Sequence, residues 1–293
     1  GNFLSGDGGI PAGGSRAMAF RMAKKARSLG AKIVTGKAVQ KILADQAKGQ
    51  ADGVLLADGT EVFCDYVVPA CDMSVTFGRL LPREKMGSLL RQMYEARGAY
   101  PVYNTFQTAM AVDSPENPLE TETIWNCPEL IFTKGMSERV TVKSYAYEPG
   151  FVPAGKQLIQ TLQGGSEEVY SYWIRLYQDP VAYQRQKSLL AERTREMLEE
   201  HFPALRGRLR VLDAWTPMTY TRYCSAYKGF YQAFSISKYS AKLPYPSAYV
   251  EGVENVVLAG QWLNPPGGLP GSATAGKFAI QRILKKEGKN FHL

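Results

Sequence analysis

NVVLAGQWLNPPGGLPGSATAGKFAIQRILKKEG, residues 255–288, is the stretch that decides the fold. Its first part, Val256 to Ala259, is a short apolar run, the pattern of a strand that is buried on both faces. A loop rich in glycine and proline follows Gly260. Ser272 is then expected to cap a helix whose small and apolar side chains recur at helical spacing. The stretch predicts a strand, a glycine-rich loop and a helix, in that order.

Such a loop is a suitable place to hold an electron-rich ligand. Glycine allows a ligand to approach the backbone closely, and the first N–H groups of a helix lack partners and point outward. A tight strand-to-helix turn that binds nothing has the same local pattern. From this stretch alone, both interpretations stay open.

The composition is that of a globular chain and excludes several classes of protein. With 293 residues, 45% hydrophobic, the chain can bury a large core and is expected to form two structural units. The four cysteines have no CxxC spacing, and only His201 and His292 could join them, so a zinc site is not expected and the thiols are expected to be free. No run is long enough to span a membrane.

The chain carries 35 Lys and Arg against 27 Asp and Glu, a formal net charge of +8. These basic residues are scattered and form no nucleic-acid-binding signature, so no nucleic-acid partner is expected. A solvated basic surface is the simplest interpretation. An anionic membrane surface or a diphosphate-bearing ligand remains as an alternative partner for the positive charge.

The first block of the chain, up to Leu81, alternates helix and strand signals. A helix is expected after Ser15, ended by Gly30. Ala31–Thr35 and Asp65–Ala70 have the composition of strands. Asp58–Gly59 is the strongest hairpin signal in the chain.

The middle region differs from the first block, because its strands have mixed faces typical of an antiparallel sheet. These strands are expected at Tyr100–Val112, Val140–Tyr147 and Gln157–Gln163. A long amphipathic helix, Tyr183–Phe202, should direct four side chains inward: Leu189, Leu190, Met197 and Leu198. Residues 210–249 are rich in aromatic side chains, which suits either ordinary core packing or the wall of an apolar ligand cavity.

Three segments of the chain resemble the FAD-dependent amine oxidase superfamily, in its phytoene desaturase and carotenoid isomerase branch. The first is IPAGGSRAMAFRMAKKARSLGAKIVTGKAVQKI (10–42) with GVLLADGTEVFCDYVVPACD (53–72). The second is DAWTPMTYTRYCSAYKGFYQ (213–232), and the third is NVVLAGQWLNPPGGLPGSATAGKFAIQRIL (255–284). They follow the family's order and span nearly the whole chain, and the third, with PPGGLPG, is the most specific.

The resemblance implies an α/β (α+β) fold. An incomplete FAD-binding Rossmann-like domain would be formed by residues 1–81 and 253–293, and a substrate-binding lobe with a mixed or antiparallel sheet and helices by residues 82–252. Family members begin with a βαβ unit that carries GxGxxG, whereas GDGGIP at Gly6 follows no strand and lacks the third glycine. We therefore expect this chain to be the C-terminal portion of such an enzyme. By itself it is expected to be inactive and to bind FAD weakly or not at all. A missing half on a separate chain is the alternative.

The resemblance also implies which residues meet the cofactor and the substrate. The backbone of Val39 would lie against the adenine, and Gly260 near the pyrophosphate and ribityl chain. The residues expected under the isoalloxazine ring are Gly268, Leu269, Pro270, Gly271 and Ser272. The expected substrate-binding residues are Trp215, Tyr227, Phe230, Tyr231 and Phe234. It implies no particular catalytic residue and no metal ligand.

The function implied by the resemblance is that of a flavoprotein oxidoreductase, of phytoene desaturase or carotenoid isomerase type. It would transfer hydride between an apolar polyene or isoprenoid substrate and FAD, chemistry that depends on placement more than on an acid–base pair. A non-catalytic prenyl-lipid-binding protein like the Rab GDP-dissociation inhibitors is the alternative, which the intact PPGGLPG loop disfavours. A cytoplasmic location is expected, with peripheral membrane contact open. The exact substrate, the electron acceptor and the oligomeric state stay open.

Overall fold

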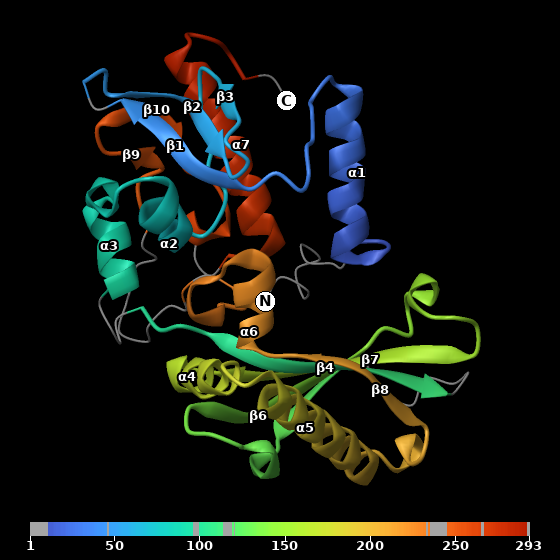
Figure 1. Ribbon diagram of the computed structural model, residues 1–293. Coiled ribbons are helices and arrows are strands. Elements are labelled where there is room, and N and C mark those ends of the chain that lie inside the picture. The colour runs from blue at the N-terminus through green and yellow to red at the C-terminus, as the bar shows by residue number, and fades with distance from the viewer. Residues whose placement is uncertain are drawn as a thin grey trace.

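The computed structural model describes residues 11–45, 47–95, 100–113, 119, 121–232, 234, 245–264 and 267–291. Figure 1 shows two groups of elements, with helix α6 (Pro217–Cys224) between them. The lower group is a five-stranded sheet with two helices on one side. The upper group contains two small sheets and the C-terminal helix, and helix α1 (Gly14–Ser28) stands at its side. The loop GDGGIP lies outside the described residues.

The lower sheet is antiparallel throughout, in the order β5-β6-β7-β4-β8. Its strands are β4 (Asn104–Asp113), β5 (Glu122–Asn126), β6 (Met136–Ser144), β7 (Lys156–Gly165) and β8 (Leu209–Trp215). The prediction of an antiparallel sheet in the middle region is confirmed. Met110 and Ile159 are cross-strand partners, so their side chains lie on the same face of the sheet. Both are fully buried beneath the helices.

Helices α4 (Glu167–Leu176) and α5 (Pro180–His201) cover that face. Helix α5 begins three residues before the predicted start at Tyr183, because the Asp179 carboxylate caps it by accepting from the N–H groups of Val181 and Ala182. Its buried stripe includes Leu190, Met197 and Leu198, as predicted. The prediction for Leu189 is wrong. Its side chain is 51% exposed because it lies one position, about 100° of helix rotation, away from Leu190.

The upper group contains the sheet β1-β2-β3, formed by β1 (Val39–Asp45), β2 (Gln50–Leu56) and β3 (Glu61–Phe63). The predicted hairpin at Asp58–Gly59 is confirmed, because Leu56 N–H donates to the Thr60 carbonyl at 2.8 Å and Gly59 has a φ of 85°. A second sheet pairs β9 (Tyr249–Val250) with β10 (Val253–Val257). The first and last parts of the chain therefore each supply one small sheet.

Backbone hydrogen bonds join the segment around Val67 to the segment around Val256. Val67 forms a parallel bridge with Val256, where Val67 N–H donates to the Asn255 carbonyl and Val257 N–H to the Val67 carbonyl, both at 3.0 Å. The run Val256–Ala259 is at most 3% exposed, which confirms a buried apolar segment after residue 255. This junction brings the residues before the glycine-rich loop beside the segment that ends at Asp72.

Two strand predictions are wrong. Ala31–Thr35 forms no strand with any described residue, and Val34 is 69% exposed. Asp65–Ala70 contributes only the bridge at Val67. Both segments have strand-forming composition, but a strand also needs a neighbour that pairs with its N–H and C=O groups.

Two predicted helix caps are also wrong. Helix α7 (Gly268–Lys286) begins four residues before Ser272, whose hydroxyl instead donates to the Gly268 carbonyl at 3.0 Å. Helix α1 begins after Gly13, so Ser15 lies inside it. In both cases a glycine with positive φ, Gly267 at 85° and Gly13 at 73°, turns the chain into the helix earlier than a serine cap would. The predicted end of α1 at Gly30, with a φ of 91°, is confirmed.

The remaining helices are short. They are α2 (Met73–Val75), α3 (Ser88–Glu95), a π-helical turn at Thr76–Leu80, and 3₁₀ turns at Arg83–Lys85, Pro128–Leu130, Pro149–Phe151, Pro203–Leu205, Tyr227–Gly229 and Gln261–Leu263. Within the described part of the chain, no helix combines the length and the apolar character that crossing a membrane requires.

The buried apolar side chains of the described residues form three clusters. One takes its buried residues from 42–102 and 226–279, and the other two take theirs from 106–218. The first cluster includes residues on both sides of the expected boundary after residue 81, such as Leu81 and Leu90. The division of the chain at residues 82 and 253 stays a prediction.

Candidate functional site

The segment Ser225–Phe230 has an unusual backbone. Ser225 and Lys228 have left-handed φ values of 51° and 49°, which cost side-chain-bearing residues free energy. Gly229 follows with a φ of 65°, and a Cβ there would lie 2.5 Å from Pro217 Cβ and 2.6 Å from the Pro217 carbonyl oxygen. Only glycine fits this position. The backbone therefore fixes the directions of the neighbouring side chains Tyr227, Lys228 and Phe230.

A buried carboxylate anchors this segment. Asp72 is fully buried, and its side chain accepts from the Tyr227 N–H at 2.8 Å, from the Tyr94 hydroxyl at 3.1 Å and from Ser74 N–H and hydroxyl. Burial raises the pKa of Asp72, and these hydrogen bonds oppose the rise. The Tyr227 hydroxyl in turn donates to the Tyr94 carbonyl at 3.0 Å. Asp72 thus connects the end of the first block to the aromatic segment.

An aromatic cluster surrounds Phe230 and Phe234, both 1% exposed. We define it as Tyr94, Tyr100, Tyr227, Phe230, Phe234 and Trp262. Phe230 and Phe234 meet edge to face at 4.7 Å between ring centroids, and Phe234 meets Tyr94 in the same way at 4.9 Å. Such tilted contacts are the favoured geometry of aromatic rings. Phe230 also lies 5.9 Å from Trp262, which connects the cluster to the turn before the glycine-rich loop.

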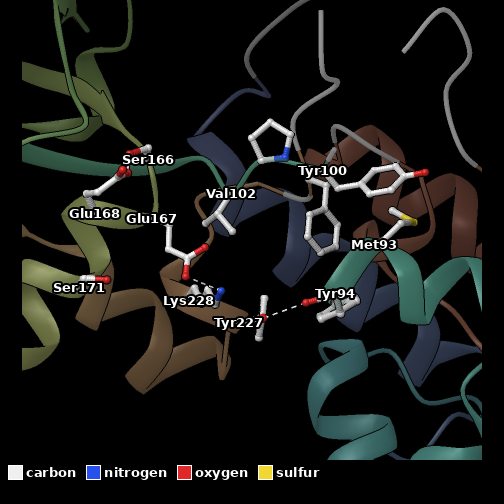
Figure 2. A pocket seen from close by; sticks show the side chains of 12 residues that line it. Met93, Tyr94, Tyr100, Val102, Ser166, Glu167, Glu168, Ser171, Tyr227 and Lys228 are labelled. Carbon is white, nitrogen blue, oxygen red and sulfur yellow. Dashed lines mark hydrogen bonds and ion pairs between the residues drawn. The ribbon is translucent and has the colours of Figure 1, made fainter. Parts of the chain in front are cut away.

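A pocket of about 430 Å³ opens on this cluster. Figure 2 shows Met93, Tyr94 and Tyr100 on one side and Ser166, Glu168 and Ser171 on the other, with Lys228 and Tyr227 between them. The volume lies within the range of about 300–1,000 Å³ that is usual for small-molecule sites. The pocket therefore has an apolar half and a polar half.

The glycine-rich loop meets the aromatic segment at Gly268. A Cβ on this residue would lie 4.0 Å from Gln232 Nε2 and 3.9 Å from Pro270 Cδ, at ordinary van der Waals distance from both. Its N–H donates to Gln261 Oε1 at 2.9 Å, and its φ of 84° favours glycine. Gly260 is constrained differently, because a Cβ there would lie 2.9 Å from the Ala70 carbonyl oxygen.

These residues fit the ring edge of a flavin in two respects. The bare Cα of Gly268 lets a flat ring approach the backbone, which a side chain there would hinder. The Gln261 side chain accepts from the first N–H group of α7, and among the described residues no acidic residue lies in the first turn, so the N–H groups that follow can face negative charge. Leu269 is 41% exposed beside them. Gly271 leaves room for a side chain, because a Cβ there would lie at an ordinary van der Waals distance, 3.5 Å, from the Asn264 carbonyl oxygen.

The other expected site residues lie in separate places. Val39 is the first residue of β1, where it pairs with Leu56 and packs against the first core cluster. Trp215 ends β8 opposite Gln107. Tyr231 donates its N–H to the Tyr103 carbonyl at 3.0 Å, and its ring lies 6.0 Å from Tyr220. The structure thus brings Tyr227, Phe230 and Phe234 together and places Trp215 and Tyr231 outside the aromatic cluster.

Sequence reasoning missed four residues of this site: Asp72, Tyr94, Glu167 and Lys228. Asp72 ends the first segment that resembles the family, and Lys228 stands between Tyr227 and Gly229 in the second. Both residues lie in segments that the sequence identifies, but no local pattern indicates their roles. Tyr94 and Glu167 had no local signal.

Comparisons with known proteins show the family and the fold to which this chain is similar. A model of the family described as "Flavin containing amine oxidoreductase" matches residues 2–284. The mouse protein named "Pyridine nucleotide-disulfide oxidoreductase domain-containing protein 2" is 24% identical over an alignment of 291 residues, which covers 89% of this chain and 48% of the mouse protein. The chain therefore spans about half the length of this relative.

Two carotenoid enzymes are also similar. A chloroplastic prolycopene isomerase of Daucus carota is 25% identical over 234 residues, 76% of this chain and 36% of that protein. A phytoene desaturase of Fusarium fujikuroi is 34% identical over 73 residues, 25% of this chain and 13% of that protein. The crystal structure of an oxidoreductase from Methanosarcina mazei superposes with a TM-score of 0.57 at 19% identity and covers 93% of this chain and 55% of that one, a likeness of fold.

Proposed function

The chain belongs to the flavin containing amine oxidoreductase family, and on this premise we propose that it forms part of a FAD-dependent oxidoreductase acting on an apolar polyene or isoprenoid substrate. FAD, when bound, supplies the hydride acceptor or donor. In this proposal Gly268 and the first turn of α7 receive the ring edge, Gly260 lies near the pyrophosphate and ribityl chain, and Val39 lies against the adenine.

One observation carries the proposal. The expected flavin loop and the expected substrate segment meet, since a Cβ on Gly268 would lie 4.0 Å from Nε2 of Gln232, which stands two residues before Phe234. The contact between Trp262 and Phe230 joins the same two segments behind the loop. A cofactor ring above Gly268 would therefore lie near an aromatic wall, which is the environment that an apolar chain requires.

The names of the two carotenoid relatives support the substrate class, and the pocket chemistry is consistent with it. Tyr94, Tyr227 and Phe234 line the pocket, whereas His201 stacks on Trp125 at the end of α5. Hydride transfer requires close positioning and exclusion of water rather than a side-chain base. An apolar substrate resides in lipid, so the proposal includes peripheral contact with a membrane surface, for which the net positive charge is suited.

The test measures bound flavin and polyene turnover in the full-length protein. Gly268→Val should lose most of the bound flavin, because its Cβ fills the proposed ring position. Gly288→Val is the matched control, since Gly288 also has positive φ, 67°, and no described heavy atom within 4 Å of its Cβ position. Stoichiometric flavin in Gly268→Val would show that the loop is only a turn. Phe234→Ala should lower turnover while flavin is retained.

A further inference from the structure

The polar half of the pocket has no role in the proposed function so far. Helix α4 contributes Glu167, Glu168 and Ser171 to it, and the strained segment contributes Lys228 (Figure 2). The opposite half, formed by Met93, Tyr94 and Tyr100, is suited to a hydrocarbon chain. An occupant that uses the whole pocket therefore has an apolar body and a polar end.

The centre of the polar half is an ion pair held in a fixed place. Lys228 Nζ lies 2.6 Å from Glu167 Oε1, and the two side chains are 20% and 37% exposed. The same ammonium group lies 5.0 Å from the centroid of the Tyr227 ring, a cation–π distance. Lys228 adopts its left-handed φ of 49° next to Gly229, so the backbone strain described above directs this side chain to Glu167.

Lys228 keeps its charge at neutral pH. Burial lowers the pKa of Lys228, but its hydrogen bonds with Glu167 and Tyr227 raise that pKa, and the net shift is upward. A charged pair in this state has spare hydrogen-bonding capacity. The ammonium group has three N–H donors, and the carboxylate has several acceptor positions.

The charges around the pair select among polar end groups. A carboxylate or phosphate end would compete with Glu167 for Lys228 and be repelled by Glu168, and an ammonium end would compete with Lys228 for Glu167. A carbonyl oxygen could accept from Lys228 but would find only another acceptor in Glu167. A hydroxyl group uses both, because its oxygen accepts from the Lys228 ammonium while its proton is donated to the Glu167 carboxylate.

We propose that the Lys228–Glu167 pair binds a terminal hydroxyl group of the substrate, with the attached hydrocarbon chain lying against Tyr94, Tyr227 and Phe234. The substrate class is then an isoprenoid or polyene alcohol. This rests on the proposed function and narrows its substrate class. A pocket of about 430 Å³ holds a short isoprenoid, or the hydroxyl-bearing end of a longer polyene.

The experiment compares three probes of similar chain on the full-length, flavin-loaded protein: farnesol, its hydrocarbon counterpart farnesene, and farnesoic acid. Dissociation constants are measured by isothermal titration calorimetry. The unaltered protein should bind farnesol about tenfold more tightly than farnesene, as expected for hydrogen bonds to charged groups. Farnesoic acid should bind more weakly than farnesol.

Two variants test the pair. Lys228→Met and Glu167→Gln should each remove the preference for farnesol and leave the affinity for farnesene unchanged. Lys187→Met is the matched control, because Lys187 pairs with Asp213 at 3.2 Å and its side chain is similarly buried, 19% exposed. It should keep the full preference. Glu167→Gln leaves the strained backbone unaltered, so it decides the question if Lys228→Met does not fold.

Equal affinities of the unaltered protein for farnesol and farnesene would overturn the proposal, as would no binding of either probe. Tighter binding of the acid, or a similar loss for both neutral probes in the two variants, would also overturn it. Flavin content and turnover of a hydrocarbon polyene are measured on the same samples. If both are present without a hydroxyl preference, only the present proposal fails. If both are absent, the proposed function fails as well.

Discussion

Many apolar side chains of the five-stranded sheet and its helices are buried, whereas the apolar side chains of helix α1 are not. In the sheet region Met110, Ile159 and Trp173 are fully buried. In α1, all of which is described, no residue is buried, and Phe20 and Met22 are 60% and 55% exposed. Helix α1 is held mainly at its start, where Gly13 N–H donates to Glu148 and Gly14 lies against Phe151. Periodicity identifies an apolar face, but burial depends on a neighbour.

The largest expected difference between the two regions is in side-chain truncation. Trp173→Ala removes a fully buried ring that stacks on Phe106 at 6.0 Å between centroids, and should cost about 3–5 kcal/mol of the free energy of unfolding. Phe20→Ala in α1 should change it by less than about 0.5 kcal/mol. Urea denaturation followed by circular dichroism measures both. Comparable losses would show that α1 packs in solution as tightly as the sheet.

The connection between the first block and the aromatic segment should give the next largest effect. Asp72→Asn replaces a carboxylate that accepts several hydrogen bonds by an amide that cannot accept at both positions. We expect a loss of about 1–3 kcal/mol, measured by the same denaturation experiment. Asp58→Asn, at an exposed ion pair with Lys37, is the control and should have no measurable effect. An equally small effect at Asp72 would contradict its role as an anchor.

Alkaline pH should weaken the contact between α6 and the sheet by a smaller amount. Burial, its largest cause, raises the pKa of Tyr220 from 10.0 to about 12, and the Tyr220 hydroxyl accepts from Gln107 at 2.6 Å. The folded state therefore holds this proton longer than the unfolded chain. The stabilisation is fully present below pH 10 and is lost as the pH rises toward 12, by up to about 2 kcal/mol.

The measurement is the melting temperature as a function of pH. Tyr220→Phe should flatten its fall between pH 10 and 12. Tyr223→Phe, on the same helix but 74% exposed, should leave the curve unchanged. If both variants behave like the unaltered protein, Tyr220 makes no contribution to alkaline unfolding.

The smallest expected effect is that of truncating an exposed side chain within the well-packed region, which distinguishes the influence of exposure from that of the region. Leu189 belongs to α5 in the well-packed region, yet it is 51% exposed, like the apolar residues of α1. Leu189→Ala should therefore cost less than about 0.5 kcal/mol, while Leu190→Ala, at 3% exposure, should cost about 2–5 kcal/mol. Urea denaturation again measures both. If Leu189→Ala lowers the free energy of unfolding as much as Leu190→Ala does, the region of the molecule rather than the exposure of the side chain determines the loss.

Features with a strong local code were predicted from the sequence. The Asp58–Gly59 hairpin, the buried run Val256–Ala259, the antiparallel strands of the middle region and most of the long helix α5 are all local patterns. The starts of α1 and α7 were missed because glycines with positive φ compete with a nearby serine, and glycine carries no side-chain signal for that choice. Ala31–Thr35 was mispredicted because strand composition does not supply a pairing partner.

The candidate site was only partly predictable for a related reason. Phe230 and Phe234 belong to one short segment, so their grouping with Tyr227 was accessible from the sequence. The hydrogen bond from Tyr227 to Asp72 spans 155 residues and the ion pair of Lys228 with Glu167 spans 61. Such contacts depend on how separate elements pack, and one sequence contains no pattern for them.

The joining of the chain ends near Asn255 also determines when each part can fold. The Asn255 side chain hydrogen-bonds to both backbone groups of Ala51, 204 residues earlier, so this part of the core cannot form until Asn255 has been synthesised. The sheet between Asn104 and Trp215 needs only contiguous chain and can form on the ribosome well before that. During synthesis the apolar residues of the first block remain without their partners for the longest time. They are therefore open to non-native contacts for longer than the sheet region is.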